Sequence, residues 1–441
     1  MPAANIAAQA GEAQIKLFEV HSNYNQPTDI SSGCIEFEYY ESILDNSVRA
    51  TAMIIDTGFR KSKEGTASVE QDDLNLTAGE KVHLKIIDGN QFTLDLTGTK
   101  QMRIKEVRNI DESTNKMMYV LDLFSKESID NELEKCRVKK RYDGKISDSV
   151  QKILKDVLKT QKNLDIDTTL NKLSFIGNVE KPFYKTTWLA PRSAPDAPGA
   201  KGVLAGFFFY ETYDGFKFKS IDKLFEQKPK KKFIFNNLIE KTPPQGYDGK
   251  ILDYAFDSTL DLKTTLLTGS QLNSKLKAVN SFESAYRENS FDSKKQFNDK
   301  NTGGKEQPQL AKDLQLQQET SKISYKWDDP GFLVPGKNLK EQLPKSTYIN
   351  YSNDEILRQS YMRYNNLFSI KLSISVKGDM SLRAGDLVAC DFPEISSKKN
   401  TVVSQKKSGI YMIVDVCHHL TKNGCFTRMN LVRESIGRKP S

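Results

Sequence analysis

The sequence predicts a β-rich α+β protein of several domains, with two similar small β-barrel domains and mixed α/β outer domains. The first observation is length, because 441 residues exceed what one hydrophobic core normally organises. The second is period-two alternation of apolar residues near both ends of the chain, which is typical of strands. The third is a short block with the pattern Leu-x-Ala-Gly-acid-x-Val, which occurs once near each end.

The two copies of this block are "LTAGEKVHLKI" from Leu76 and "LRAGDLVACDF" from Leu382. Alternating segments follow both copies in the same order and at similar distances. Gly79 to Val107 is 28 residues, and Gly385 to Val416 is 31. These spacings favour an internal duplication. Generic β-hairpin composition is the alternative explanation.

Further strands are expected in the first unit at "QIKLFEV", "CIEFEYY" and "VRATAMIIDTG", so this unit reads as a small barrel or a curled sheet. In the last unit, the even positions from Ile410 to Leu420 form one expected buried face. The Asn423-Gly424 pair predicts a tight hairpin turn. That turn would place His418 opposite Met429 and Val416 opposite Leu431.

The middle of the chain shows a helix and a hairpin. Residues 143–159 carry a helical apolar face, with Ser147 or Asp148 as candidate N-caps. Ala205–Tyr213 and Phe216–Lys219 read as two strands around an Asp-Gly turn. Ser220 is in N-cap position for a following helix, with Leu224 on its apolar side.

Less regular segments follow. The basic run "EQKPKKKF" at 226–233 predicts a solvated edge or loop, with an electrostatic contact to a partner as the minority interpretation. The polar stretch 291–329 predicts a long surface loop or a partly ordered arm. A helix capped by Asn353 or Asp354 is expected next, carrying Ile356, Tyr361 and Tyr364 and leading into the strand "SIKLSISVKGDM".

No residue pattern predicts catalysis or metal binding. Zinc is commonly bound by cysteine and histidine, which occur together at Cys417, His418, His419 and Cys425. The expected strand and tight turn hold these side chains too far apart to bind one ion. Glu211 and Asp214 could be imagined as a catalytic carboxylate pair, but structural roles are favoured because one sits in a strand and the other in a turn. We therefore expect no catalytic, metal or cofactor-binding residues and no cofactor.

Composition narrows the class of protein further. The five cysteines form no CxxC pair, which suggests reduced structural thiols in a protein made in the cytoplasm. The N-terminus has no basic segment followed by an apolar one, so no secretion signal is expected. No apolar run approaches bilayer length, so membrane insertion is not expected. The formal charge of +8 fits a solvated lysine-rich surface better than a nucleic-acid footprint.

Four segments resemble the baseplate hub protein of T-even-like contractile-tailed bacteriophages. They are "FEYYESILDNSVRATAMIIDTG", "GFFFYETYDGFKFKSIDKLF", "FSIKLSISVKGDMSLRAGDLVACDFPE" and "SGIYMIVDVCHHLTKNGCFTRMNLVRES". The resemblance covers most of the chain in order and is weak between about 294 and 345. These motifs are patterns of fold rather than of chemistry.

The resemblance implies a structural virion protein of the tail baseplate, assembled in the host cytoplasm. It implies a homotrimer whose two tube-type barrels per chain form a pseudo-sixfold ring between a trimeric central spike and a sixfold tail tube. Other implied partners are the tape-measure protein and further baseplate proteins, and DNA would pass through the channel without specific binding. Neither the motifs nor the resemblance indicates which residues form the interfaces.

The resemblance also implies a division of the chain. The expected parts are residues 1–124 as the first barrel, 125–245 as a mixed outer domain, 246–275 with 366–435 as a discontinuous second barrel, 276–365 as an inserted outer domain with the polar arm, and 436–441 as a tail. Two alternatives stay open. One is a tail-associated cell-wall hydrolase, and the other is a nucleic-acid-binding protein prompted by "KKRYDGK" and "KPKKKF".

Overall fold

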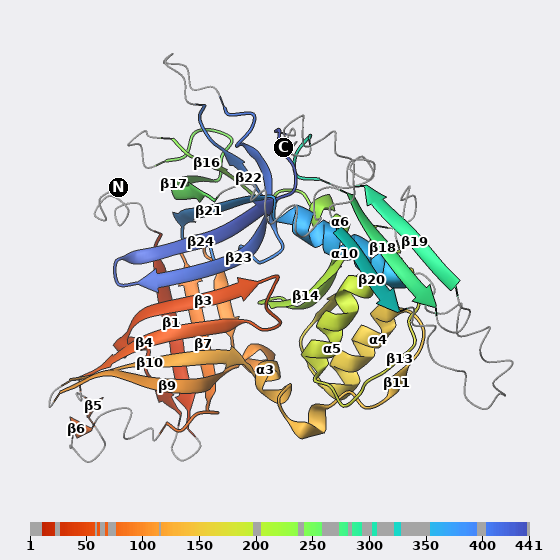
Figure 1. Ribbon diagram of the computed structural model, residues 1–441. Helices are drawn as coiled ribbons and strands as arrows, with labels where there is room; N and C mark the ends of the chain where they lie inside the picture. The colour runs from red at the N-terminus through yellow and green to blue at the C-terminus, as the bar shows by residue number, and fades with distance from the viewer. Residues whose placement is uncertain are drawn as a thin grey trace.

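The structure is a computed structural model of the chain (Figure 1). It describes residues 11–22, 27–57, 60–61, 67–68, 76–113, 116–196, 204–236, 242–257, 273–280, 285–292, 302–306, 322–327, 353–394 and 403–438. Most of the strands belong to one 14-stranded sheet that curls into two units lying side by side.

The second barrel is closed by six strands that pair in a ring. In spatial order these are β16 (Lys231–Ile234), β22 (Leu387–Asp391), β23 (Gly409–Thr421), β24 (Gly424–Arg433), β21 (Ile370–Lys377) and β17 (Gly249–Phe256), and β17 pairs again with β16. All six contribute to one core, which contains Phe233, Ile251, Ile374, Val388, Tyr411 and Leu431. The inward positions explain the apolar alternation seen in the sequence.

The first barrel has six strands around a second core. In spatial order these are β1 (Ala13–His21), β7 (Lys81–Asp88), β9 (Met102–Ser113), β10 (Lys116–Ser125), β4 (Arg49–Asp56) and β3 (Cys34–Ser42). Among the described strands, β1 and β3 do not pair with each other. The short strand β2 (Thr28–Asp29) pairs with β1 there instead, so this barrel is curled but not closed by a direct strand pair.

The two barrels use their strands in the same order. Numbered along the chain within each barrel, the spatial order is first, fourth, fifth, sixth, third and second in both. One pairing differs in direction, because β1 is antiparallel to β7 whereas β16 is parallel to β22. The expected duplication is therefore confirmed at the level of strand order.

The repeated sequence block makes the same backbone contacts in both barrels. The Gly79 N–H donates to the Ile104 carbonyl at 2.7 Å, and the Gly385 N–H donates to the Ile413 carbonyl at 2.8 Å. Both glycines have left-handed backbone, with φ of 94° and 88°. Glycine is required there because a Cβ makes this conformation unfavourable.

The acidic residue of the block closes the turn in both copies. The Thr77 N–H donates to Glu80 Oε1 at 2.9 Å, and the Arg383 N–H donates to Asp386 Oδ2 at 2.8 Å. In each copy, the backbone N–H is satisfied by the carboxylate three residues later, so the turn needs no hydrogen bond from another segment of the chain for this donor. The Leu-x-Ala-Gly-acid pattern is thus a self-contained turn that leads into the fourth strand of each barrel.

A bulge occurs at the same place in both barrels. Lys105 is the extra residue between β9 and β10, and Val414 is the extra residue between β23 and β24. The bulge reverses which side of β23 faces the core, so Tyr411 and Ile413 lie in the barrel core before it and Val416 after it. The even positions Met412 and Val414 are also buried, in a separate core that includes Phe208 and Leu367, so the expected buried face of even positions is confirmed.

The duplication provides a matched pair of mutations. Gly79→Ala should lower the free energy of unfolding by about 1–2 kcal/mol through backbone strain alone, because a Cβ there would meet nothing within 4 Å. Gly385→Ala should lower it by a further 1–3 kcal/mol or so, because its Cβ would lie 2.3 Å from the Tyr210 hydroxyl oxygen. Urea unfolding of both variants tests this. Equal losses would show that the packing of Gly385 against Tyr210 contributes nothing.

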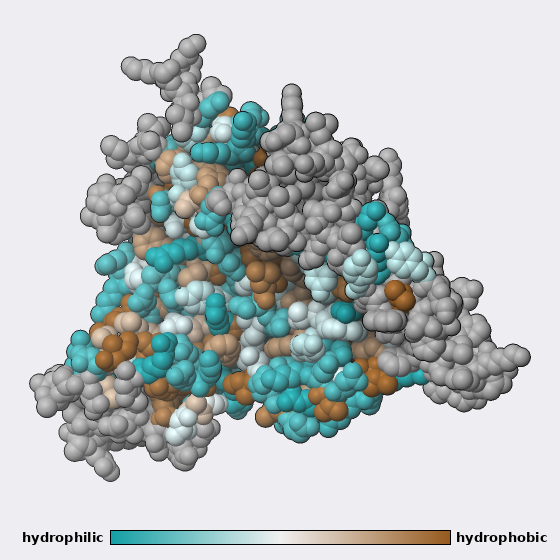
Figure 2. All heavy atoms as spheres, in the orientation of Figure 1, coloured by the Kyte–Doolittle hydropathy of each residue, from teal (hydrophilic) through white to brown (hydrophobic). Residues whose placement is uncertain are grey.

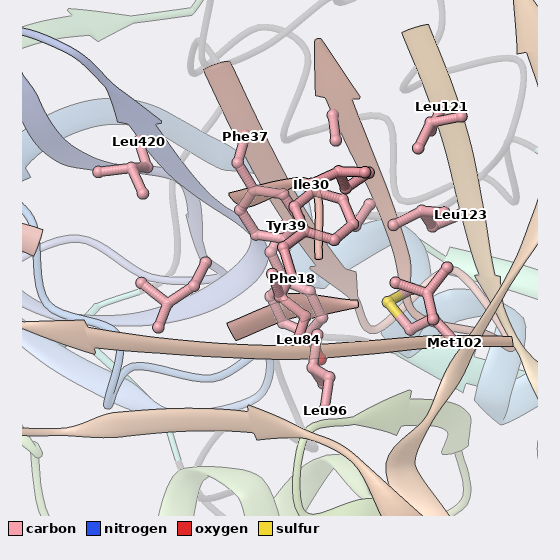
Figure 3. Close-up of a cluster of buried hydrophobic side chains, with 14 of the residues drawn as sticks. Phe18, Ile30, Phe37, Tyr39, Leu84, Leu96, Met102, Leu121, Leu123 and Leu420 are labelled. Atoms are coloured by element: carbon pink, nitrogen blue, oxygen red, sulfur yellow. The ribbon is translucent and has the colours of Figure 1, made fainter. Parts of the chain in front are cut away.

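The two barrels are continuous through the antiparallel pair β3–β23, which extends from Asp415↔Ser42 to Thr421↔Glu36. β23 therefore serves both barrels. Its Leu420 lies in the core of the first barrel, beside Phe37 and Tyr39 in Figure 3. The strands of both barrels consequently belong to one continuous sheet.

A mixed α/β outer domain packs beside the barrels and has its own core, which includes Val150, Phe183, Phe209 and Phe218. Its elements are α3 (Lys126–Asp130), β11 (Arg141–Tyr142), α4 (Ile146–Lys152), a π-helical turn (Ile153–Val157), β12 (Leu164–Ile166), β13 (Phe175–Ile176), α5 (Pro182–Leu189), β14 (Phe207–Thr212), β15 (Gly215–Ser220) and α6 (Ile221–Glu226). The Ser220 cap of α6 is confirmed, since its hydroxyl accepts the Lys223 N–H at 3.2 Å.

The inserted segment adds a three-stranded sheet and a long helix. They are β18 (Asn273–Asn280), β19 (Ala285–Asp292), β20 (Lys322–Trp327) and α10 (Asn353–Leu367). Short elements complete the described chain: β5 (Arg60–Lys61), β6 (Ala67–Ser68), β8 (Thr93–Leu96) and the 3₁₀ turns Ser31–Gly33, Gly98–Lys100, Glu134–Cys136 and Ala190–Arg192.

The β23–β24 hairpin differs from expectation. The β23–β24 hairpin turns at Lys422 and Asn423, so His418 lies opposite Thr427 rather than Met429, and Val416 opposite Met429 rather than Leu431. The shift is two residues, so every side chain keeps its expected face. Gly424, with φ of 137°, is the first residue of β24 instead of a turn residue.

The start of α4 and the basic run also differ from expectation. The N-cap of α4 is Lys145, whose side chain makes no capping hydrogen bond. Ser147 and Asp148 lie inside the helix, and the Ser147 N–H donates to the Thr169 hydroxyl oxygen at 3.0 Å. Part of the basic run is the strand β16, which pairs with β22 and β17 instead of forming a loop.

Within the polar stretch 291–329, the structure describes the end of β19, the strand β20 and a short segment in which Glu306 forms an isolated bridge with Ile436. β19 and β20 therefore belong to a sheet rather than to a loop. The rest of the expected arm, at 293–301, 307–321 and 328–329, lies outside the described residues.

Candidate functional site

A buried carboxylate, Glu41, joins three parts of the fold. It follows Phe37 and Tyr39 in the inward-facing row of β3, so the strand delivers it to the end of the first core. Its Oε1 accepts the Tyr213 N–H at 2.7 Å from the β14–β15 turn of the outer domain. Its Oε2 accepts the Ala384 N–H at 3.1 Å from the repeated turn of the second barrel.

Arg383 balances the charge of this carboxylate. Its Nε lies 3.8 Å from Glu41 Oε1, and its guanidinium stacks over the rings of Phe92 and Tyr213 at 5.0 and 4.7 Å. Burial nevertheless raises the pKa of Glu41 to about 7, although Arg383 and the two backbone donors favour the ionised form. The group is a cross-link between domains, and its side chain is fully buried.

Lys162 makes a second buried joint. Its Nζ lies 2.8 Å from Glu127 Oε2 on α3 and 2.5 Å from Glu211 Oε1 on β14. Glu211 Oε2 also accepts the Val48 N–H at 3.1 Å, which ties the outer domain to the first barrel. Glu211 is therefore fully engaged, and Asp214 lies in the adjacent turn. This arrangement gives both carboxylates structural positions and forms no acid–base pair.

α10 is fixed to the outer domain by a third buried group. Arg363 Nη1 lies 2.8 Å from Asp222 and donates to the Ala205 carbonyl at 2.8 Å. The Tyr364 hydroxyl donates to the Phe207 carbonyl on β14. With the Glu41 and Lys162 joints, this holds the barrels, the outer domain and α10 in fixed relative positions.

The Cys–His cluster of the second hairpin is spread over both faces of the sheet. His418 is buried, with Nδ1 3.1 Å from the Thr427 hydroxyl and Nε2 3.1 Å from the Leu382 carbonyl, and burial lowers its pKa to about 3. His419 points the other way, with Nε2 2.6 Å from Glu36. Cys425 faces the first core beside Leu420. The structure thus does not bring these four side chains together.

The surface shows a band of three adjoining hollows, which we call the interface band. The first hollow, of about 410 Å³, lies over the β3–β23 junction and shares Asp45 and Arg49 with the second, of about 380 Å³. The second shares Asn46, Tyr184 and Thr187 with the third, of about 370 Å³. Polar and charged residues, among them Asp253, Asp415 and Arg428, make up most of the lining of the first hollow. The third is mostly apolar, and its lining includes Ile43, Leu44, Tyr184, Trp188, Phe208 and Tyr361.

Three large side chains of the third hollow are exposed although they are apolar or aromatic. Leu44 is 58% exposed, Tyr184 57% and Tyr361 49%. Figure 2 shows hydrophobic side chains gathered in the centre of the molecular face, where β14 lies in Figure 1. Exposed apolar groups that converge on one hollow are typical of a protein–protein contact. The sequence indicated Tyr361 only as a helix residue and gave no signal for Leu44 or Tyr184.

Comparison with known proteins identifies the fold. No protein-family model and no curated protein sequence matches the chain. The 43 kDa tail protein of prophage MuSo2 from Shewanella oneidensis is similar, with 7% identity, a TM-score of 0.50 and coverage of 96% of this chain and 100% of that one. This chain has the fold of a phage tail protein.

Two further structures are similar over nearly the whole chain. The tail protein from Neisseria meningitidis MC58 has 10% identity and a TM-score of 0.49, and covers 97% of this chain and 98% of its own. The c3393 protein of E. coli, a type VI secretion component similar in structure to T4 tail proteins gp27 and gp5, has 10% identity, a TM-score of 0.39 and coverage of 98% and 79%. Among the described helices, none is long and apolar enough to cross a membrane.

Proposed function

We propose that this chain is a structural baseplate hub protein of a contractile phage tail, and that it acts by assembly rather than by catalysis. The observation that carries the proposal is the pair of barrels that share one strand order and one continuous sheet. Three such chains around an axis supply six similar barrels. Such a ring has threefold symmetry in its chains, which matches a trimeric spike. It has approximate sixfold symmetry in its barrels, which matches a sixfold tail tube.

The remaining partners follow from the same model. The ring would surround the channel through which the tape-measure protein and DNA pass, and DNA would slide through without specific binding. The outer domain and α10 would brace the ring and meet other baseplate proteins. The chain would belong to the virion tail.

The strand β16 pairs with β22 and β17 of the second barrel, so we propose that this barrel begins at residue 231 rather than 246.

The buried carboxylates favour this function over a cell-wall hydrolase. Glycoside hydrolysis needs two carboxyl groups that face one accessible cleft. Glu41 and Glu211 are buried and accept backbone N–H groups of neighbouring domains, and Glu127 is buried and paired with Lys162. The basic run favours the structural interpretation too, because Lys230 and Lys231 pair with Asp386 and Asp379 instead of facing a polyanion.

We propose further that the interface band is the contact between protomers. It combines an exposed apolar end with a polar end over the barrel junction, which fits the apolar core and polar rim of a stable interface. Leu44, Tyr184 and Tyr361 would be its anchors, since large exposed side chains gain most from burial.

Native mass spectrometry tests the ring, with the chain alone and with the spike protein of the same genome. We expect a trimer of 50.0 kDa subunits in at least one of the two samples. A monomer in both samples would disprove the ring.

A mutation pair tests the band separately. Leu44→Asp should raise the dissociation constant of each contact at least tenfold, because burying a leucine contributes about 1.5–3 kcal/mol. Leu170→Asp is the matched control, since Leu170 is 49% exposed but lies outside the band, and it should leave assembly unchanged. Equal assembly of both variants would show that the trimer contact lies elsewhere.

A further inference from the structure

Two histidines and a glutamate converge on the outer face of the first barrel. Glu19 and His21 lie on β1, and His83 lies directly opposite Glu19 on β7. Their strand neighbours Phe18, Val20, Val82 and Leu84 fill the core, so the three side chains point outward by alternation. Each is a quarter to a third exposed, at 28% for His21, 30% for Glu19 and 25% for His83.

The three potential ligand atoms face one another. His21 Nε2 lies 3.0 Å from His83 Nδ1 and 3.1 Å from Glu19 Oε2, and His83 Nδ1 lies 3.8 Å from that oxygen. Ligands bound tetrahedrally to zinc at about 2.0–2.2 Å are about 3.3–3.6 Å apart. The triangle therefore needs shifts of only a few tenths of an ångström to receive the ion.

Gln101 contacts His83 at the ring nitrogen that does not face His21. Its Oε1 lies 3.4 Å from His83 Nε2, and an amide oxygen at this position favours the tautomer that carries the proton on Nε2 and directs the Nδ1 lone pair at His21. One proton, on His21 Nε2, then lies between the histidine nitrogen and the glutamate oxygen. A divalent cation that replaces this proton would gain three ligands at once.

We propose that Glu19, His21 and His83 form a zinc site that clips β1 to β7 and keeps a fourth position open to water. Two imidazole nitrogens and one carboxylate oxygen are a zinc ligand set, and partial exposure allows the ion to enter. A second cluster, of Glu36, Glu38 and His419, offers only one imidazole nitrogen and is less suited to zinc. The inference is independent of the proposed hub function.

A zinc ion here would reinforce the attachment of β1, the strand at the open side of the first barrel. Among the described strands, β1 pairs with β7 on one side and only with the two-residue strand β2 on the other. A metal ion bound by residues of β1 and β7 would add a link near the end of this strand pair, where His21 is opposite Lys81. Zinc should consequently stabilise the native chain, since an ion that binds only the folded state raises stability by mass action.

The experiment is equilibrium dialysis of the full chain against zinc, with any polyhistidine tag removed, followed by measurement of zinc per protein. Wild type should retain one zinc per chain. Glu19→Gln, His21→Gln and His83→Gln should each weaken zinc binding by at least about tenfold, and Gln101→Leu by about tenfold through loss of ring orientation. Glu36→Gln is the matched control at the other cluster and should retain zinc.

Two readouts separate metal binding from misfolding. Cobalt bound to wild type should give the intense visible absorption of a tetrahedral site, and zinc should raise its unfolding temperature. His83→Gln should unfold like metal-free wild type and lack both effects. Wild type without bound zinc, His83→Gln with unchanged affinity, or zinc lost from Glu36→Gln would each overturn the proposal.

Discussion

Glu41→Ala is expected to lower the free energy of unfolding by about 3–5 kcal/mol, because it removes one partner of a buried charged pair. Arg383 would keep its charge in a buried position, and the N–H groups of Tyr213 and Ala384 would lose their acceptor. Since these donors belong to the outer domain and the second barrel, both should loosen from the first barrel. Urea unfolding measures the loss, and the rate of limited proteolysis under native conditions provides a separate measure of domain loosening.

Glu38→Ala is the control for this change. Glu38 lies three residues earlier on the same strand, is partly exposed and pairs with Tyr40 and His419 at the surface. Its loss should cost less than about 1 kcal/mol. If both variants lost the same stability, the three-way joint at Glu41 would not be a principal link between domains.

The pH dependence of this joint has a defined sign. Folding raises the pKa of Glu41 from 4.5 to about 7, so the folded state binds more protons than the unfolded state between these values. The contribution of the group to stability is therefore largest below about pH 4.5 and declines as pH rises through 7. Glu41→Gln cannot titrate. The stability of wild type relative to Glu41→Gln should consequently fall between pH 5 and 8, and a difference independent of pH would contradict the raised pKa.

The repeated turn could be predicted from sequence because all its determinants are local. The glycine needs left-handed backbone, and the acid three residues after Thr77 or Arg383 accepts the N–H of that residue. The joint at Glu41 could not be predicted, because its two backbone donors lie 172 and 343 residues away in the sequence. In β3, Glu41 looks like an ordinary polar residue at a strand end.

The hairpin error has a similar physical origin. The Asn423-Gly424 pair favours a tight turn at those two residues. Thr421 moves the turn back by one residue, since its hydroxyl accepts the Asn423 N–H at 3.2 Å and donates to the Gly424 carbonyl at 3.1 Å. Gly215 similarly begins β15, after a turn at Tyr213 and Asp214. In both hairpins the glycine is the residue after the turn.

The interface band and the histidine cluster were missed for one common reason. Each is assembled from segments that the fold brings together: Leu44 from a barrel turn, Tyr184 from α5 and Tyr361 from α10. His21 and His83 are 62 residues apart and meet only because β1 pairs with β7. Alternation predicts which face of a strand a residue occupies. It does not predict which strand lies beside it.

Lys162→Met is expected to lower the free energy of unfolding by about 3–5 kcal/mol, because Glu127 and Glu211 would both stay buried without a cation. Burial lowers the pKa of Lys162, but the two carboxylates outweigh this effect and raise the pKa above its usual value. The lysine is therefore held in its charged form at this joint. Lys181→Met is the control, because the Lys181–Glu132 pair is exposed and should contribute less than about 1 kcal/mol.

A rescue variant identifies the cause of that loss. If the unpaired carboxylates are responsible, adding Glu127→Gln and Glu211→Gln to Lys162→Met should restore most of the stability. The amide oxygens can still accept the Thr160 hydroxyl and the Val48 N–H, while the buried negative charges are gone. If instead the triple variant were as unstable as Lys162→Met, the lysine would stabilise the joint by packing rather than by charge. The outer domain would then depend on the apolar contacts of β14 for its position beside the barrels.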